Sequence, residues 1–137
     1  MESKIEDYLT ACEFLGIDPN AKPDVSKLDP SDAKYMANHF ELMIINRAIC
    51  KEYSVQEKLP KIWEPDYSIS QYKYYPRFFV EADKQRPSGF GLSNPTYGHW
   101  RTSATCGSRF ALPTPEHVYY SAEKFKKHHT INQLIIK

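Results

Sequence analysis

The sequence predicts an α+β fold, with N-terminal helices and a C-terminal helix packed on a small antiparallel β-meander. Three observations lead to it. Apolar residues recur at helical spacing through residues 1–57. Residues 58–112 are rich in aromatic and β-branched side chains separated by turn formers, a pattern typical of short strands. A capping residue followed by proline then restarts a helix in residues 113–137. The chain has 137 residues, which suits one domain over 1–137.

The first helix is expected over residues 4–15. Ser3 and Glu6 have the spacing of a capping box, in which the two side chains satisfy free amides at a helix start. Apolar residues follow at helical intervals, and Gly16 suits the end of the helix. Residues 17–28 contain two prolines and two aspartates and are expected to form an ordered loop.

A second, long helix is expected to start at Asp29-Pro30. Asp29 serves as the cap, and Pro30 occupies the first helical position, where its missing N–H costs nothing. An apolar stripe continues to about Tyr53 and predicts one buried face. Its members are Ala33, Met36, Ala37, Phe40, Ile44, Ala48 and Ile49.

Three strands are expected at residues 77–82, 90–93 and 99–105, with residues 109–112 as a candidate fourth. The inward-facing side chains expected on this sheet are Phe78, Val80, Phe90, Leu92, Phe110 and Leu112.

The last helix is expected from Thr114-Pro115 to about Lys127, where Lys126, Lys127, His128 and His129 complement the negative end of the helix dipole. The apolar tail, residues 131–137, is expected to dock as a last strand or a turn.

Charge is distributed unevenly, although the net charge is only +1. Residues 1–60 carry 7 Lys or Arg against 11 Asp or Glu, whereas residues 61–137 carry 11 against 6. The small net charge argues against a generic polyanion binder. The acidic first half and basic second half predict a modest electrostatic field that is positive on one side of the protein. No apolar run approaches the roughly 20 residues that a membrane-spanning helix needs, so we expect no membrane partner.

Three cysteines, Cys12, Cys50 and Cys106, are widely separated and odd in number. This pattern is typical of reduced thiols rather than of a disulfide framework. The acidic start of the chain does not have the pattern of a signal peptide.

Aromatic residues concentrate in the middle of the chain, where residues 61–112 hold 11 of the 19. One interpretation is a small sheet whose wide rings supply core volume or a protein interface. The other is an outward plane of rings rimmed by cations, which would stack on nucleobases and hold phosphates. The candidate ligand-binding residues for this surface are Tyr72, Lys73, Tyr74, Arg77, Trp100 and Arg101, together with Arg109 beside Gly107.

Catalytic and metal motifs are weak. Gly89, Gly91 and Gly107 lie in short loops that match neither a P-loop nor a dinucleotide fingerprint. No zinc-type spacing of cysteine and histidine occurs. A nucleophile, a base and an acid could be assembled from Cys106, His99 or His117, and Glu116, but any chain of this size contains such a set by chance. Glu64 and Asp66, which flank Pro65, are expected to lie in a solvated turn. We expect a non-enzymatic protein with no cofactor and no metal.

Several segments together resemble a family of small uncharacterised proteins from phages and prophages of gut Bacteroidetes. The similarity covers most of the chain and departs at the C-terminal helix, where residues 113–115 replace a Lys-Ser start. It implies a phage setting and no activity. The matching segments are Cys12–Pro19, Pro23–Ser26, Ile44-Ile45, Trp63–Tyr67, Gln71–Pro76, Pro87–Gly91 and Gly107–Phe110.

These observations lead to one functional hypothesis and two alternatives. The hypothesis is a non-catalytic phage or prophage accessory protein that binds a protein, nucleic acid or nucleotide through the aromatic and basic sheet surface, with a nucleic-acid-associated or counter-defence role. The alternatives are a virion structural component, for which the same rings would serve self-assembly, and an unrecognised enzyme. The expected location is the bacterial host cytoplasm or the virion, with homo-oligomers left open.

Overall fold

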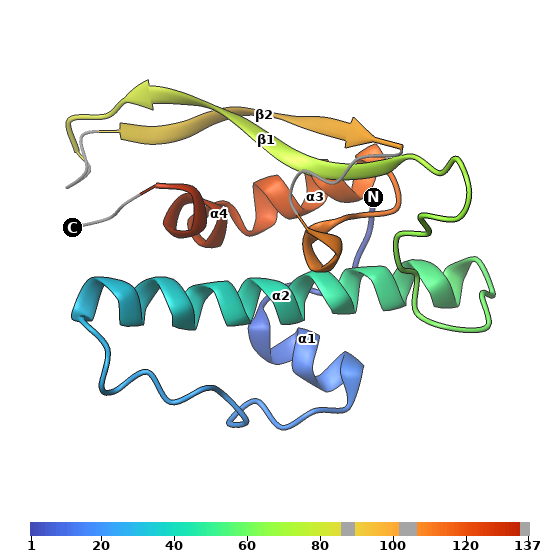
Figure 1. Cartoon of the computed structure of the whole chain (residues 1–137), viewed down its shortest axis with the longest axis horizontal. Coiled ribbons are helices and arrows are strands. Elements are labelled where there is room, and N and C mark those ends of the chain that lie inside the picture. The colour runs from blue at the N-terminus through green and yellow to red at the C-terminus, as the bar shows by residue number, and fades with distance from the viewer. Residues whose placement is uncertain (86–89, 102–106, 135–137) are drawn as a thin grey trace.

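The structure is a computed structural model that describes residues 1–85, 90–101 and 107–134. It is an α+β fold, as the sequence predicts. Figure 1 shows its layers in order: the sheet, then α3 and α4, then the long α2, with α1 against the far side of α2. The described elements are α1 (Tyr8–Leu15), α2 (Pro30–Gln56), β1 (Lys73–Ala82), β2 (Phe90–Trp100), the 3₁₀ turn η1 (Ser108–Phe110), α3 (Pro115–Lys124) and α4 (Lys126–Gln133).

Helix α2 confirms the predicted long helix but not the first part of its buried stripe, since Met36 is 43% exposed and Ala37 is also exposed. Asp29 caps it by accepting a hydrogen bond from the Ser31 amide at 3.1 Å, and Pro30 occupies its first turn. The helix extends three residues beyond the expected Tyr53 and reaches Gln56. Its central positions Ile45 and Ile49 are fully buried, each a gain of about 2 kcal/mol of transfer free energy.

Helix α1 begins at Tyr8, four residues later than the sequence predicts. Asp7 is the cap, since its carboxylate accepts a hydrogen bond from the Thr10 amide at 2.7 Å. The Thr10 hydroxyl accepts one from the Asp7 amide at 2.9 Å. The predicted capping box at Ser3 is wrong, because the Glu6 amide, which would donate to Ser3, donates to the Thr10 hydroxyl at 2.9 Å. The Ser3 hydroxyl donates to Glu52 of α2 at 2.6 Å. Gly16 ends α1 in the left-handed conformation, as predicted.

The core lies between α2 and the elements on both of its sides. Helix α1 packs on one side, and α3 packs on the other together with Leu112, three positions before its start. Among the described residues this cluster consists of Ile5, Tyr8, Ala11, Cys12, Ile44, Ile45, Ala48, Ile49, Cys50, Leu112, Val118 and Phe125.

The sheet is one long hairpin rather than a meander of short strands. β1 and β2 pair antiparallel from Lys73↔Trp100 to Ala82↔Phe90, with a bulge between Arg77 and Phe79. Strands expected at 90–93 and 99–105 are therefore a single strand as far as Trp100, and residues 102–105 lie outside the described ranges.

The candidate fourth strand at residues 109–112 is wrong except at its end. Residues 108–110 form η1, in which the Phe110 amide donates to the Gly107 carbonyl. Leu112 alone bridges β1, exchanging two backbone hydrogen bonds with Tyr74.

The expected inner face of the sheet is only partly correct. Leu92 and Leu112 are buried, as predicted, and Phe78 and Phe110 are half-buried. Val80 is 55% exposed, although its partner across the two strands, Leu92, is buried. The side chain of Phe90 lies outside what the structure describes.

The predicted C-terminal helix is two helices. Thr114 caps α3, accepting a hydrogen bond from the His117 amide, and Pro115 follows as predicted. Phe125 then leaves helical geometry, so that α4 starts anew at Lys126. The expected docked tail is helical through Gln133, and residues 135–137 lie outside the described ranges.

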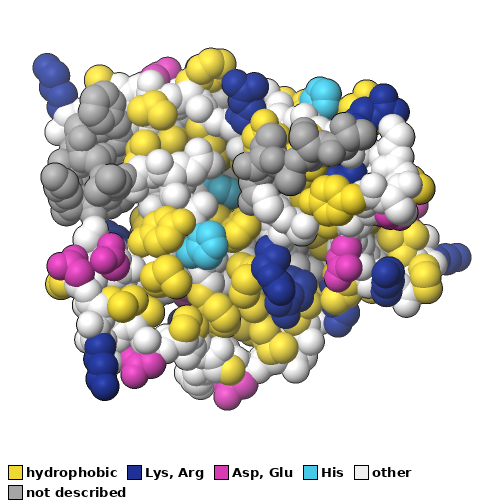
Figure 2. Space-filling model, viewed as in Figure 1, with side chains coloured by type: hydrophobic (Ala, Val, Ile, Leu, Met, Phe, Trp, Pro, Cys, Tyr) yellow, Lys and Arg dark blue, Asp and Glu magenta, His cyan; other side chains and the backbone are white. Residues whose placement is uncertain are grey.

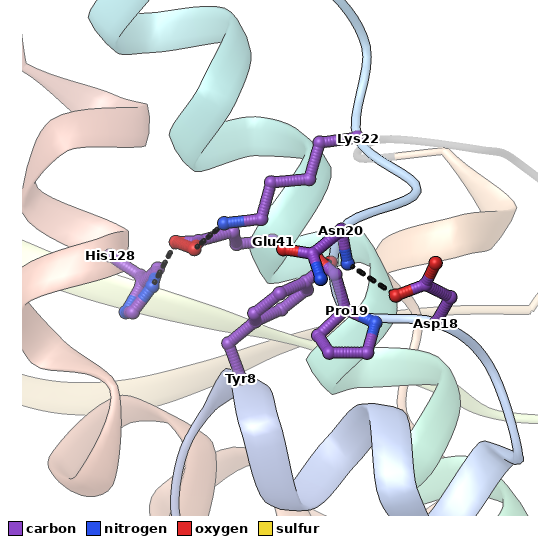
Figure 3. Close-up of polar contacts among 7 residues, drawn as sticks. All are labelled: Tyr8, Asp18, Pro19, Asn20, Lys22, Glu41 and His128. Carbon is purple, nitrogen blue, oxygen red and sulfur yellow. Dashed lines mark hydrogen bonds and ion pairs between the residues drawn. The ribbon is translucent and has the colours of Figure 1, made fainter.

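The loop between α1 and α2 is ordered by side-chain contacts, as the sequence predicts. The Tyr8 hydroxyl donates to the Pro19 carbonyl at 3.1 Å, and Lys22 Nζ lies 4.6 Å above the Tyr8 ring (Figure 3). Lys22 also pairs with Glu41 of α2 at 3.2 Å, and Glu41 contacts His128 of α4 at 3.3 Å. One short network thus joins the loop to two helices.

Candidate functional site

Two of the seven predicted ligand-binding residues do not face outward. Lys73 and Trp100 pair across the hairpin and are 0% and 4% exposed. The expected single plane is wrong for a geometric reason. Successive strand residues point to opposite faces, so Lys73 cannot share a face with Tyr72 and Tyr74.

The buried Lys73 has a structural environment. Its Nζ donates to the carbonyls of Gln71 and Arg101 at 2.9 Å each and lies 5.0 Å from the centre of the Tyr67 ring. A buried ammonium needs such partners, because desolvation of an unpaired charge is costly. Lys73 therefore ties the segment before β1 to the end of β2.

The opposite face of the hairpin carries the other predicted rings. Arg101 lies 4.7 Å above the centre of the Tyr72 ring, and Tyr72 is 44% exposed. Tyr72 and Tyr74 are stacked at 6.2 Å, and both contact His99. With Tyr97, 5.5 Å from Tyr74, these residues form what we call the hairpin-base cluster: Tyr72, Tyr74, Tyr97, His99 and Arg101.

The remaining two predicted residues, Arg77 and Arg109, lie elsewhere, at a pocket of about 670 Å³. This volume is in the range of small-molecule sites. We call it the central pocket. Figure 2 shows hydrophobic and histidine side chains side by side in the band between the sheet and α2. The lining comes from α2, β1, η1 and α4: Tyr35, His39, Leu42, Asn46, Tyr75, Pro76, Arg77, Phe78, Gly107, Ser108, Arg109, Phe110, His129, Asn132 and Gln133.

Tyr75 reaches the central pocket by lying flat across β2. Gly98 is its partner on the neighbouring strand, and a Cβ at Gly98 would lie 2.0 Å from Tyr75 Cζ. The Trp100 ring is 5.6 Å away. Sequence reasoning missed Tyr75, and only the strand register, which pairs this tyrosine with a glycine, could have singled it out.

Helices α2 and α4 form one wall. His39 Nδ1 is 2.8 Å from Asn132 Oδ1, so a side-chain hydrogen bond joins the two helices at the pocket. The His39 ring stacks on Tyr35 at 5.5 Å and contacts Phe110 of η1 at 4.7 Å. Three rings from two elements therefore lie together along this wall.

His129 is the buried titratable group of this wall. Its Nε2 is 3.0 Å from the Ser121 hydroxyl, and its ring is 5.4 Å from Phe78. Burial lowers the pKa of His129 to about 4, with the neighbouring His128 acting in the same direction. His129 is therefore neutral at pH 7.

The charge at the central pocket is one-sided. Its described lining contains Arg77 and Arg109 and no Asp or Glu. Within the part of the chain that the structure describes, no hydrogen bond or ion pair engages either guanidinium. Arginine presents five donors in a fork that matches phosphate or carboxylate.

Asn46 fixes the backbone that carries Arg109. Its side-chain amide donates to the carbonyls of Arg109 and Ala111, at 2.9 and 3.0 Å. The Ser108 hydroxyl is 3.0 Å from that of Tyr67, which anchors the other end of η1. The turn is therefore held from both sides, with Arg109 exposed.

A second pocket of about 330 Å³, the side pocket, adjoins the first. Burial raises the pKa of the Cys50 thiol beside it to about 12, which leaves no thiolate for nucleophilic chemistry at neutral pH. The side pocket is lined by Met43, Asn46, Arg47, Cys50, Ile62, Trp63, Glu64, Pro65, Ser108 and Arg109.

The structure offers little for the other chemistry that the sequence raises. Cys106 lies outside the described residues, and His117 is buried beside Thr114, where burial lowers its pKa. Asp66 sits in an exposed turn, and hydrogen bonds from Ser68 lower its pKa. Among residues 1–85, 90–101 and 107–134, no three His, Cys, Asp or Glu side chains gather as a metal site.

These elements and pockets belong to an α+β fold. The chain matches no protein-family model, and neither a curated protein nor a solved structure is significantly similar to it. Over the described residues, none of the helices is both long enough and apolar enough to cross a membrane.

Proposed function

We propose that this protein binds a nucleotide in the central pocket and performs no chemistry on it. One observation carries the proposal: two arginines that have no hydrogen-bond or ion-pair partner among the described residues border a pocket lined by rings and amides, with no carboxylate in its described lining. An anionic ligand that also has a flat ring is the natural complement of such a site.

Arg77 and Arg109 would hold phosphate by charge-assisted hydrogen bonds. Tyr35 and Phe110 supply faces for stacking, worth roughly 1–3 kcal/mol per base. Gln133 offers both donor and acceptor atoms for a base edge.

Binding alone is favoured because the described lining of the central pocket contains no carboxylate, and because a pKa lowered to about 4 by burial makes His129 a weak base. The resemblance to phage and prophage proteins suggests the setting. A small protein that captures nucleotides could act on nucleic acid or withdraw a nucleotide signal inside a bacterial host, as an accessory or counter-defence factor.

Calorimetric titration with GMP and AMP, at low and moderate salt, tests the proposal. We expect Arg77→Gln and Arg109→Gln each to weaken binding roughly 10- to 100-fold, because each removes a charged contact to phosphate. Arg101→Gln is the matched control and should leave the affinity unchanged, since Arg101 lies in the hairpin-base cluster. Absence of binding by the unmodified protein, or an equal loss in the control, would refute the proposal.

A virion structural component is the second candidate, favoured by the exposed end of the hairpin. Phe79 and Val80, consecutive residues of β1, are 60% and 55% exposed. Exposed apolar strands promote association between chains. Light scattering after size-exclusion chromatography separates the candidates: a virion component should assemble, and Phe79→Ser with Val80→Ser should abolish assembly, whereas a nucleotide-binding factor should remain small.

A further inference from the structure

We infer that the ligand has two bases, one in the central pocket and one in the side pocket, joined by a phosphate that lies on Arg109. This inference rests on the proposed function and specifies its ligand class. The two pockets share Asn46, Ser108 and Arg109, so they are adjoining parts of one surface. Arg109 is the cation common to both.

The dimensions suit a ligand longer than one nucleotide. Along α2 the linings run from Tyr35 to Cys50, which is about 22 Å at 1.5 Å per residue. The α2 residues of the two linings form two neighbouring stripes that meet at Asn46: Tyr35, His39 and Leu42 in the central pocket, and Met43, Arg47 and Cys50 in the side pocket. Helix α2 therefore contributes to both pockets.

The side pocket is suited to a base rather than to a phosphate alone. Trp63, Met43 and Ile62 offer apolar and aromatic surface. Glu64 is also part of the lining, and an ionised carboxylate only accepts hydrogen bonds and repels anions. A base with an N–H-rich edge, such as guanine, satisfies both features.

Arg47 gives the side pocket its own cation. It is half-buried, and no ion pair between described residues joins it to Glu64. Arg47 lines the side pocket and Arg109 lines both pockets, so a phosphate on Arg109 would have a second guanidinium group on the side-pocket side. The central pocket retains Arg77 for a terminal phosphate.

Three probes separate a second base from added charge: GMP, GDP, and the 5′-phosphorylated dinucleotide pGpG. We expect pGpG to bind the full chain at least about 10-fold more tightly than GMP or GDP, since a second base adds stacking. Glu64→Ala and Arg47→Gln should weaken pGpG binding and leave GMP binding unchanged. Glu57→Ala, an exposed change outside both pockets, is the control and should affect neither ligand.

The outcomes distinguish the two proposals. If GMP, GDP and pGpG bind equally, or if Glu64→Ala and Arg47→Gln weaken GMP as much as pGpG, the two-base inference fails and the proposed function stands. If GDP matches pGpG and exceeds GMP, the gain comes from charge, and the inference again fails. If no probe binds, both proposals fail.

Discussion

The base of the hairpin, with Lys73 and Arg101, and the central pocket, with Arg77 and Arg109, both bring cations close to aromatic rings. The contacts that these cations make differ between the two regions. At the base, Lys73 is buried and donates to two carbonyls, and Arg101 lies over the Tyr72 ring. At the pocket, Arg77 and Arg109 have no partner within the described residues. The cations of the base therefore make contacts within the protein, whereas those of the pocket are available to the ligand that we propose.

The predicted binding surface therefore consists of a structural region at the hairpin base and a candidate binding region at the central pocket. Abundance of rings and cations alone does not separate a structural cluster from a site, because the two share the same residue types. What separates them is whether each cation already has a hydrogen bond or a ring contact within the protein. Changes at the base should therefore affect stability, and changes at the pocket should affect binding.

The largest expected effect concerns the pocket wall and pH. His129 has a native pKa of about 4 against an ordinary value of 6.5, so the unfolded chain takes up its proton first as the pH falls. The contribution of His129 to stability is complete above pH 6.5. It is lost progressively down to about pH 4, a change of about 3 kcal/mol.

Urea unfolding of the protein and of His129→Gln, from neutral pH to pH 4, measures this contribution. The variant should show a flatter dependence across that window. The carboxylates and His117 are common to both proteins, so their effects cancel in the difference. An identical pH dependence in the two proteins would show that His129 is not protected from protonation in the folded state.

At the hairpin base, Lys73→Met should reduce the free energy of unfolding by about 2 kcal/mol, because the carbonyls of Gln71 and Arg101 lose a charged donor. Lys61→Met is the control, since Lys61 is exposed. Urea denaturation measures both variants. Equal stability of Lys73→Met and the unmodified protein would contradict a structural role, and a selective loss of nucleotide binding would move Lys73 into the site.

A smaller loss, about 1–2 kcal/mol, is expected for Gly98→Ala, because the new methyl group displaces the Tyr75 ring. A double-mutant cycle with Tyr75→Ala isolates the contact. Thermal unfolding should show that Gly98→Ala costs much less once Tyr75 is truncated. Additive losses would mean that the glycine is needed for another reason.

The smallest effect is expected for Arg101→Gln, at most about 1 kcal/mol of stability, because its interaction with Tyr72 is exposed to solvent. Chemical denaturation should detect little change. A loss as large as that of Lys73→Met would show that the two cations of the hairpin base act as one unit.

Local signals in the sequence predicted much of the fold. Asp29-Pro30, Gly16 and Thr114-Pro115 act through neighbouring atoms, so the boundaries that they mark were confirmed or lay within a few residues. The Ser3 capping box failed because the distant Glu52 holds the Ser3 hydroxyl and the Lys4 amide, and the Glu6 amide donates to Thr10 instead. Competition of this kind depends on tertiary structure.

The candidate site was harder to predict, because it depends on register and on contacts between distant segments. The bulge between Arg77 and Phe79 interrupts the alternation that would have oriented β1. Placement of Arg109 depends on Asn46, 63 positions earlier in the chain. The sequence showed which kinds of side chain the candidate site would contain. It did not show which of the cations would lack a partner among the described residues.

Arginine side-chain NMR gives the most direct test of the contrast between the two regions. The Nε–Hε signals of Arg77, Arg101 and Arg109, assigned by substitution to glutamine, are followed while pGpG is added. We predict that the signals of Arg77 and Arg109 shift together and saturate while that of Arg101 stays in place. A shift of Arg101 with Arg77 and Arg109 unmoved would contradict the assignment of binding to the central pocket.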